Sequence, residues 1–143
     1  MNAQDSRALV ADVLGFPYAI GANGPDAFDC WGLVRFAYRE HFGVSLPEYA
    51  THRETKTKTV ASKIQEVEAL GEWQSVDEPQ AGDLVALSRG KVFHHVGLWV
   101  DVDGGRCLHA LEGATVVAHS LQQLRRDHFT RIQFFRHGQK LHN

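Results

Sequence analysis

Cys30 is the residue best placed to act as a nucleophile. It follows Asp29, a good helix N-cap, and the apolar spacing after it predicts a helix over Cys30–Phe42. The unpaired N–H groups and positive end of a helix favour a thiolate in the first turn, and Gly32 would keep that turn narrow, with room for a substrate. The competing interpretation is a buried, inert cysteine. The glycine- and proline-rich loop before Asp29 favours the reactive one.

His95 is the candidate general base. It lies in the run Phe93–Val100, whose alternation predicts a strand with Gly97 on the same face as His95 and His94 on the opposite face. The missing side chain of Gly97 leaves space beside the imidazole. A histidine that only makes a structural hydrogen bond fits the same pattern. We therefore interpret His95 as a general base only in combination with Cys30.

His109 is the candidate orienting residue. It lies in Arg106–Leu111, and a hairpin around Asp103–Gly105 would bring it to His95, within one or two residues of register. A polar group there can fix the tautomer of the first imidazole; an exposed strand histidine is the alternative. Cys30, His95 and His109 together supply the nucleophile, base and orienting partner of a cysteine hydrolase.

The same region also contains soft metal ligands. However, no Cys-x-x-Cys or His-x-x-x-His pair is present, and the spacing is poor for zinc. We therefore expect no metal and no cofactor. The residues considered for a metal site are Cys30, His94, His95, Cys107 and His109.

Several blocks of the sequence resemble the NlpC/P60 family of papain-like cysteine peptidases, and they follow the family's order. The specific signal is the combination of Asp-Cys-x-Gly-Leu-Val with Gly-Asp-Leu-Val and His-Val-Gly; any block alone would be weak. The blocks extend from about Leu14 to Val117 and are Pro17–Gly21, Gly24–Val34, Leu46–Pro47, Ala81–Val85, His95–Trp99 and Leu108–Ala110.

This resemblance implies a reaction and a catalytic set. Members typically hydrolyse the bond between D-glutamate and a diamino acid in a peptidoglycan stem peptide. Cys30 would be the nucleophile, His95 the base and His109 the third polar residue, with Tyr18 beside the thiolate.

The resemblance also implies a substrate pocket. Asp29 and residue 31 match the family's pocket for the free amino end of the stem peptide. That position is usually small and is Trp31 here, so two interpretations stay open. The indole either packs on a neighbouring loop or narrows the pocket and contacts substrate.

Two other functions remain open. The same fold could serve an amidase, thioesterase or acyltransferase, an alternative that Trp31 raises. The chain could also be an inactive tail or wall-binding module, although the intact Cys30, His95 and His109 set argues against this. Because the run Asp-Cys-aromatic-Gly-Leu-Val-Arg resembles tail-tip peptidases of phages and prophages, phage tail proteins are expected partners besides the stem peptide.

Helices are expected early in the chain and strands late, which predicts an α+β fold with an antiparallel sheet. The resemblance implies a papain-like, NlpC-type fold in which N-terminal helices, with the catalytic cysteine at a helix start, pack on a five- to six-stranded antiparallel sheet. The predicted helices are Asp5–Leu14, Cys30–Phe42 and Val60–Leu70, and the predicted strands are Asp83–Ser88, Val92–Val100, Arg106–Leu111, Thr115–His119 and Thr130–Arg136.

Length and composition narrow the function classes. The 143 residues suit one domain over 1–143, with a core of about 5–136 and a flexible tail at 137–143. A net charge of −2 argues against nucleic-acid binding, and two cysteines are too few for a disulfide framework.

The start of the sequence shows no signal peptide, and no apolar run reaches the roughly 18 residues of a membrane span. We expect synthesis in the cytoplasm and association with a virion tail or delivery to the cell wall.

Overall fold

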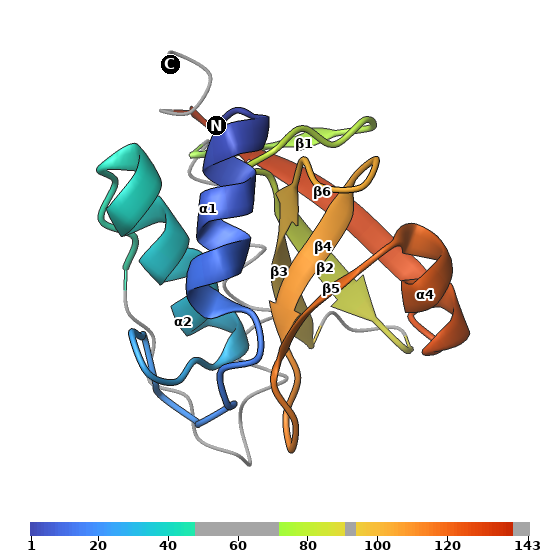
Figure 1. Cartoon of the computed structure of the whole chain (residues 1–143). Helices are drawn as coiled ribbons and strands as arrows, with labels where there is room; N and C mark the ends of the chain where they lie inside the picture. The colour runs from blue at the N-terminus through green and yellow to red at the C-terminus, as the bar shows by residue number, and fades with distance from the viewer. Residues whose placement is uncertain (48–71, 91–93, 139–143) are drawn as a thin grey trace.

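The computed structural model describes residues 1–47, 72–90 and 94–138, in which helices come first and a six-stranded sheet follows (Figure 1). This confirms the α+β class. The elements are α1 (Ala3–Val13), α2 (Cys30–Ala37), the π-helix η1 (Tyr38–Phe42), β1 (Trp73–Val76), β2 (Leu84–Ser88), β3 (His95–Val100), β4 (Arg106–Ala110), β5 (Val116–His119), α4 (Leu121–Arg126) and β6 (Arg131–His137).

The two N-terminal helices begin at side-chain caps. Asn2 and Asp5 form a reciprocal capping box at the start of α1, so this helix begins two residues before the predicted Asp5. Asp29 caps α2, as predicted. The predicted helix Cys30–Phe42 is continuous, but its last five residues widen into the π-helix η1 before Gly43 ends it with a φ of 66°.

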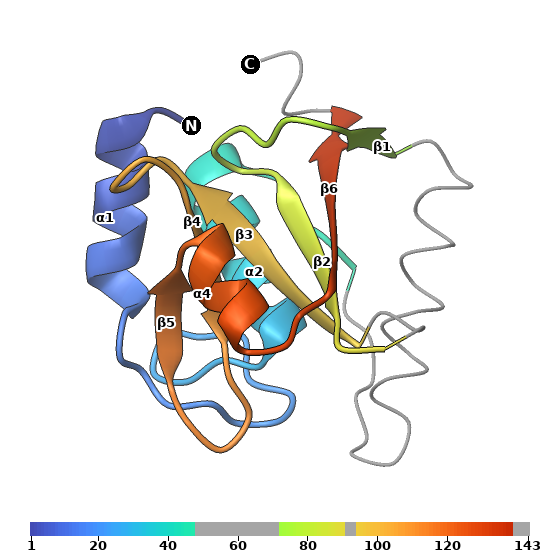
Figure 2. The same ribbon diagram turned by 90° about the vertical axis from the view of Figure 1, so that its right-hand side faces the viewer.

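The sheet is antiparallel throughout and has the strand order β1-β6-β2-β3-β4-β5. The last strand in sequence, β6, lies between β1 and β2 (Figure 2). The hairpin between β3 and β4 turns at Asp103–Gly105, as predicted, and all three of these residues have positive φ.

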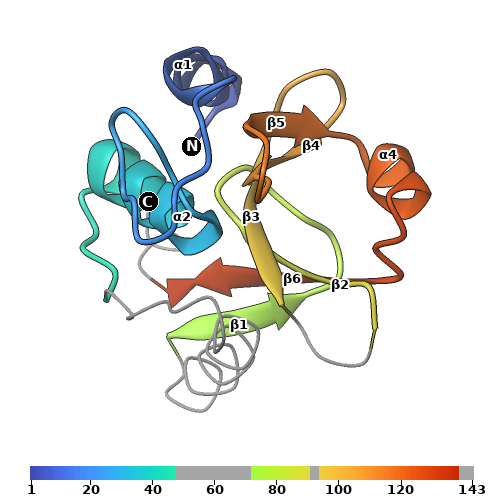
Figure 3. The same cartoon turned by 90° about the horizontal axis from the view of Figure 1, so that it is seen from below.

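The two faces of the sheet carry different helices: α1 and α2 lie on one side and α4 on the other (Figure 3). The predicted alternation of β3 matches this division. Val96 and Leu98 join the buried cluster of α1 and α2, whereas Trp99 packs with Leu124 of α4 and with Phe129.

The Gly-Asp-Leu-Val block ties the helices to the sheet. Asp83 is fully buried and accepts two hydrogen bonds from Arg136, at 2.7 and 3.0 Å. Tyr38 donates its hydroxyl proton to the Gly82 carbonyl at 2.6 Å. This block therefore fixes the junction of α2 and η1 against the sheet at β2 and β6.

Some expected elements differ from the structure or lie outside it. The predicted helix Val60–Leu70, the polar stretch Thr51–Thr59 and residues 92–93 lie outside the described residues. The strand predicted to end at Arg136 continues to His137, which pairs with Trp73, so residue 137 belongs to the sheet and not to the expected tail. Residues 139–143 of that tail lie outside the described residues. Within the described ranges, no helix is long and apolar enough to cross a bilayer.

Candidate active site

Cys30 is the first residue of α2, and the helix start is built around Asp29. The two carboxylate oxygens of Asp29 accept the backbone N–H of Gly32 at 2.6 Å and of Gly21 at 2.9 Å. The Cys30 side chain is 2% exposed, so the accessible thiol expected of a nucleophile is not what the structure shows. It lies in the same buried cluster as Val96 and Ala110, the sequence neighbours of His95 and His109.

Gly32 has a different role from the one predicted. A Cβ at this position would overlap the carbonyl oxygen of Ala22 and lie 2.9 Å from Oδ1 of Asp29. The glycine is thus required by the close approach of the 14–29 loop and the capping carboxylate. Room for a substrate does not explain it.

Tyr18 lies in the loop that leads to Asp29. It forms an isolated bridge with Phe28, two residues before Cys30, and its ring packs against the cluster that contains Cys30. Its backbone N–H donates to the Ala114 carbonyl at 3.1 Å, which ties this loop to the turn between β4 and β5.

Trp31 packs on the chain that follows η1. Its indole Nε1–H donates to the Pro47 carbonyl at 2.8 Å, and the ring is partly buried against the helix-side cluster. These contacts agree with the interpretation in which the indole packs on a neighbouring loop. Its role toward substrate stays a prediction.

His95 and His109 meet across β3 and β4, as predicted. Nε2 of His95 lies 2.9 Å from Nδ1 of His109, and the two side chains are 6% and 0% exposed. Gly97 makes this approach possible, because a Cβ there would lie 2.9 Å from Cβ of His109 and 2.6 Å from Sγ of Cys107. The space expected beside the imidazole is therefore filled by β4.

A third histidine extends the pair. Nε2 of His109 lies 3.1 Å from Nδ1 of His119 in β5, so His109 is held at both ring nitrogens. Burial, followed by the charges of His119 and Arg89, lowers the pKa of His109 to about 3. His109 is consequently neutral near pH 7, with a proton on only one of its nitrogens.

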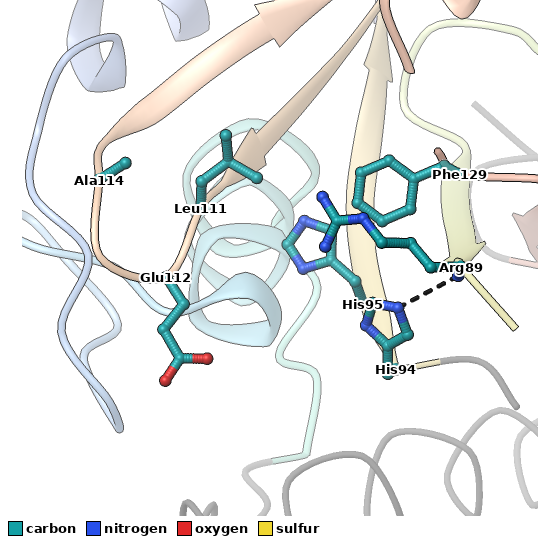
Figure 4. A pocket seen from close by; sticks show the side chains of 7 residues that line it. All are labelled: Arg89, His94, His95, Leu111, Glu112, Ala114 and Phe129. Atoms are coloured by element: carbon teal, nitrogen blue, oxygen red, sulfur yellow. Dashed lines mark hydrogen bonds between the residues drawn. The ribbon is translucent and has the colours of Figure 1, made fainter. Parts of the chain in front are cut away.

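A pocket of about 240 Å³ opens beside His95. In Figure 4, Arg89 and Phe129 lie on one side, Leu111, Glu112 and Ala114 lie on the other, and His94 and His95 lie between them.

His94 lines the same pocket as His95, so the prediction that it points to the opposite face is wrong. The alternation fails because β3 begins at His95 and His94 precedes it. Nε2 of His94 instead accepts the backbone N–H of Arg89 at 3.2 Å.

Phe129 supports one wall of the site. Its ring stacks on His95, with ring centroids 5.8 Å apart and planes 14° apart. The Arg89 guanidinium lies 4.1 Å from the centre of the same ring, and Nε of Arg89 donates to the Asp127 carbonyl at 2.9 Å. These contacts hold a cation at the edge of the pocket.

The described structure thus brings together His95 and His109 and places Cys30 at the start of the helix that packs on their strands. Sequence reasoning missed His119, although this residue ends a predicted strand that pairs with the strand of His109. Among the described residues, no group of three or more His, Cys, Asp or Glu could hold a metal ion.

Comparison with known proteins gives the family. The NlpC/P60 family model matches residues 15–133. A probable endopeptidase of Corynebacterium glutamicum is 35% identical over 112 residues, 78% of this chain and 44% of the relative. The murein DD-endopeptidase and murein LD-carboxypeptidase MepS of Escherichia coli is 28% identical over 113 residues, 79% of this chain and 52% of the relative. The chain spans about half the length of these curated relatives.

A solved structure gives the same architecture. The NlpC/P60 domain of the peptidoglycan hydrolase SagA superposes with a TM-score of 0.61 at 24% identity, covering 94% of this chain and 97% of that domain. The family match covers the Cys30 helix, the histidine strands and most of the sheet. The chain belongs to the NlpC/P60 family.

Proposed function

We propose that this chain is a cysteine peptidase that hydrolyses peptide bonds in peptidoglycan stem peptides. The observation that carries the proposal is the 2.9 Å contact between His95 and His109 at the edge of a pocket, on strands against which the Cys30 helix packs. The family and the names of the relatives, endopeptidases and a peptidoglycan hydrolase, point to the same chemistry.

The proposed reaction has two stages, formation of a thioester on Cys30 and its hydrolysis, and in each stage His95 takes up one proton and releases it. The Cys30 thiol gives its proton to Nδ1 of His95, and the thiolate attacks the amide carbonyl carbon. N–H groups of the first turn of α2 stabilise the oxyanion. His95 then protonates the leaving amine, which breaks the C–N bond and leaves a thioester. A water molecule then gives a proton to His95 and attacks the thioester carbonyl, the C–S bond breaks, and the acyl group leaves as a carboxylic acid. His95 returns the proton to the Cys30 thiolate.

The proposed substrate bond joins D-glutamate to a diamino acid. Tyr18, Asp29 and Trp31 are the proposed substrate-binding residues. The Asp29 carboxylate already accepts two backbone N–H groups, so an ammonium group would bind to a carboxylate whose direction the helix cap has fixed.

We also propose that the chain acts as part of a phage or prophage tail, with tail proteins as partners and the host wall as target. The support is the Asp-Cys-Trp-Gly-Leu-Val-Arg run alone. Detection of the chain in purified virions by mass spectrometry would support this location, and its absence from them would contradict it.

The experiment that tests the reaction is digestion of purified peptidoglycan, with mass analysis of the fragments. The wild type should release fragments that end in D-glutamate and fragments that begin with the diamino acid. Cys30→Ala and His95→Ala should release neither, whereas Cys107→Ala should remain active. An amidase would instead free whole stem peptides from the glycan, and the absence of any product would contradict hydrolysis.

A further inference from the structure

His119 is joined to the proposed base through a single buried residue. The chain of contacts runs from Nε2 of His95 to Nδ1 of His109 at 2.9 Å, and from Nε2 of His109 to Nδ1 of His119 at 3.1 Å. All three rings meet at wide angles, 61° and 67°, so each contact is made edge-on through the ring nitrogens. The exposed fraction rises from 0% at His109 to 21% at the side chain of His119.

The neutral state of His109 couples the two contacts. A neutral imidazole donates from one nitrogen and accepts at the other. If Nδ1 of His109 accepts a hydrogen bond from Nε2–H of His95, then Nε2 of His109 carries the proton and donates to Nδ1 of His119. In this first sense, Nδ1 of His119 carries no proton.

The opposite sense reverses every role. Nδ1–H of His119 would donate to Nε2 of His109, and Nδ1–H of His109 would donate to Nε2 of His95. His95 would then have no proton on Nε2, and it could not become an imidazolium without breaking its contact with His109.

Only the first sense suits a general base. When His95 takes the thiol proton on Nδ1, it carries protons on both nitrogens and needs an acceptor at Nε2. We propose that His119 is a positioning residue whose unprotonated Nδ1 fixes the tautomer of His109 and so keeps His95 able to hold the proton of Cys30. This inference rests on the proposed cysteine peptidase function.

The groups around His119 show what would reverse the sense. The Asp127 carboxylate, just after α4, lies 3.9 Å from Nδ1 of His119, too far for a hydrogen bond. The Cys107 thiol is its cross-strand neighbour in β4, and burial raises the pKa of that thiol, which stays neutral. Arg89 acts on His109 from the end of β2. The sense would reverse if Nδ1 of His119 carried a proton, because that N–H would then donate to Nε2 of His109.

The test uses two substitutions of His119 and one matched control, all in the full chain. His119→Leu removes the acceptor. His119→Asn places an amide oxygen near the position of Nδ1 that accepts a hydrogen bond and does not titrate. His128→Asn is the control, because His128 is exposed and its φ of 71° suits asparagine.

Two readouts separate positioning from structure. Histidine ¹⁵N chemical shifts report which nitrogen of His109 carries the proton, and kcat and KM on soluble peptidoglycan fragments are measured from pH 5 to 8. We expect the Nε2–H tautomer of His109 in the wild type. We expect His119→Leu to lower kcat about 10- to 100-fold, by analogy with the loss seen when the hydrogen-bond partner of a metal-ligating histidine is removed, with KM changed less than about twofold.

His119→Asn decides the outcome if the leucine variant does not fold. It should keep kcat within about threefold of wild type at pH 7.5, because its amide oxygen can accept the Nε2–H of His109. A wild-type His109 protonated on Nδ1, an unchanged kcat in a folded His119→Leu, or a kcat of His119→Asn as low as that expected for His119→Leu would overturn the proposal. Failure of every protein to cleave peptidoglycan would overturn the proposed function. The tautomer measurement would still show in which direction the hydrogen bonds between the three histidines run.

Discussion

The two cysteines of this chain lie in surroundings that differ in charge, although both are buried and neither forms a disulfide. Cys30 begins a helix, where backbone N–H groups stabilise a thiolate. Cys107 lies in β4 in an apolar cluster, and burial raises the pKa of its thiol. We expect iodoacetamide at pH 7.5 to label Cys30 first, as measured by peptide mass spectrometry. Labelling should vanish in Cys30→Ala, and faster modification of Cys107 would contradict a reactive Cys30.

Trp31 allows a test that separates packing from specificity. Trp31→Ser loses the hydrogen bond to the Pro47 carbonyl and the ring's contacts with the helix-side cluster. If the indole limits substrate choice, the serine variant should stay folded and change the ratio of rates on free tripeptide and intact peptidoglycan. A loss of stability of about 2 kcal/mol or more, measured by urea unfolding, would assign the ring to packing. A folded variant with the wild-type ratio would contradict the specificity role.

The sequence predicted that His95 and His109 lie together because the residues between them carry information. The hairpin around Asp103–Gly105 placed His109 beside His95 to within one or two residues of register, and the structure brings the two side chains into contact. The orientation of His94 was wrong because alternation holds only inside a strand, and the strand begins one residue later. The link to His119 depends on the register between β4 and β5, which the sequence pattern alone does not fix.

At the scale of elements, the spacing between β3 and β4 depends on one glycine. A Cβ at Gly97 would lie 2.6 Å from Sγ of Cys107 and 2.8 Å from the Leu108 carbonyl oxygen, and this oxygen is backbone and cannot turn away. We expect Gly97→Ala to lower the free energy of unfolding by about 1–3 kcal/mol and to lower activity by separating His109 from His95. Gly90→Ala is the matched control, since a Cβ there meets nothing within 4 Å. Equal stability of the two variants, measured by urea unfolding, would contradict the close approach.

The elements that sequence reasoning missed are short. β1 has four residues and α4 has six, too few for a clear period of two or of 3.6. α4 nevertheless carries a visible start signal, because Ser120 and Gln123 form a capping box. Its omission also hid Phe129, which packs with Leu124 of that helix and stacks on His95.

At the scale of the whole molecule, a buried neutral histidine makes stability depend on pH. The pKa of His109 is about 3 in the folded chain against an ordinary value of 6.5. The unfolded chain therefore binds a proton at His109 below pH 6.5 that the folded chain does not bind until about pH 3, and the free energy of unfolding falls as the pH falls through this window. The loss from this residue is up to about 1.4 kcal/mol for each pH unit.

His109→Gln removes this dependence. Urea unfolding of wild type and variant between pH 7 and 4 should give a shallower pH slope for the variant, whatever its stability at pH 7. Parallel slopes would show that the folded protein binds the proton as readily as the unfolded chain does.

The central place of β6 has a consequence for biosynthesis. This strand, residues 131–137, pairs with β1 on one side and β2 on the other, so the sheet is divided until it joins. On the ribosome, Cys30 emerges about a hundred residues before β6, so the sheet stays divided after the Cys30 helix has been made. Under the proposed function, a nascent chain would therefore carry its nucleophile well before the complete sheet against which the site is built. We expect a chain that stops before residue 131 to lack wall-cleaving activity.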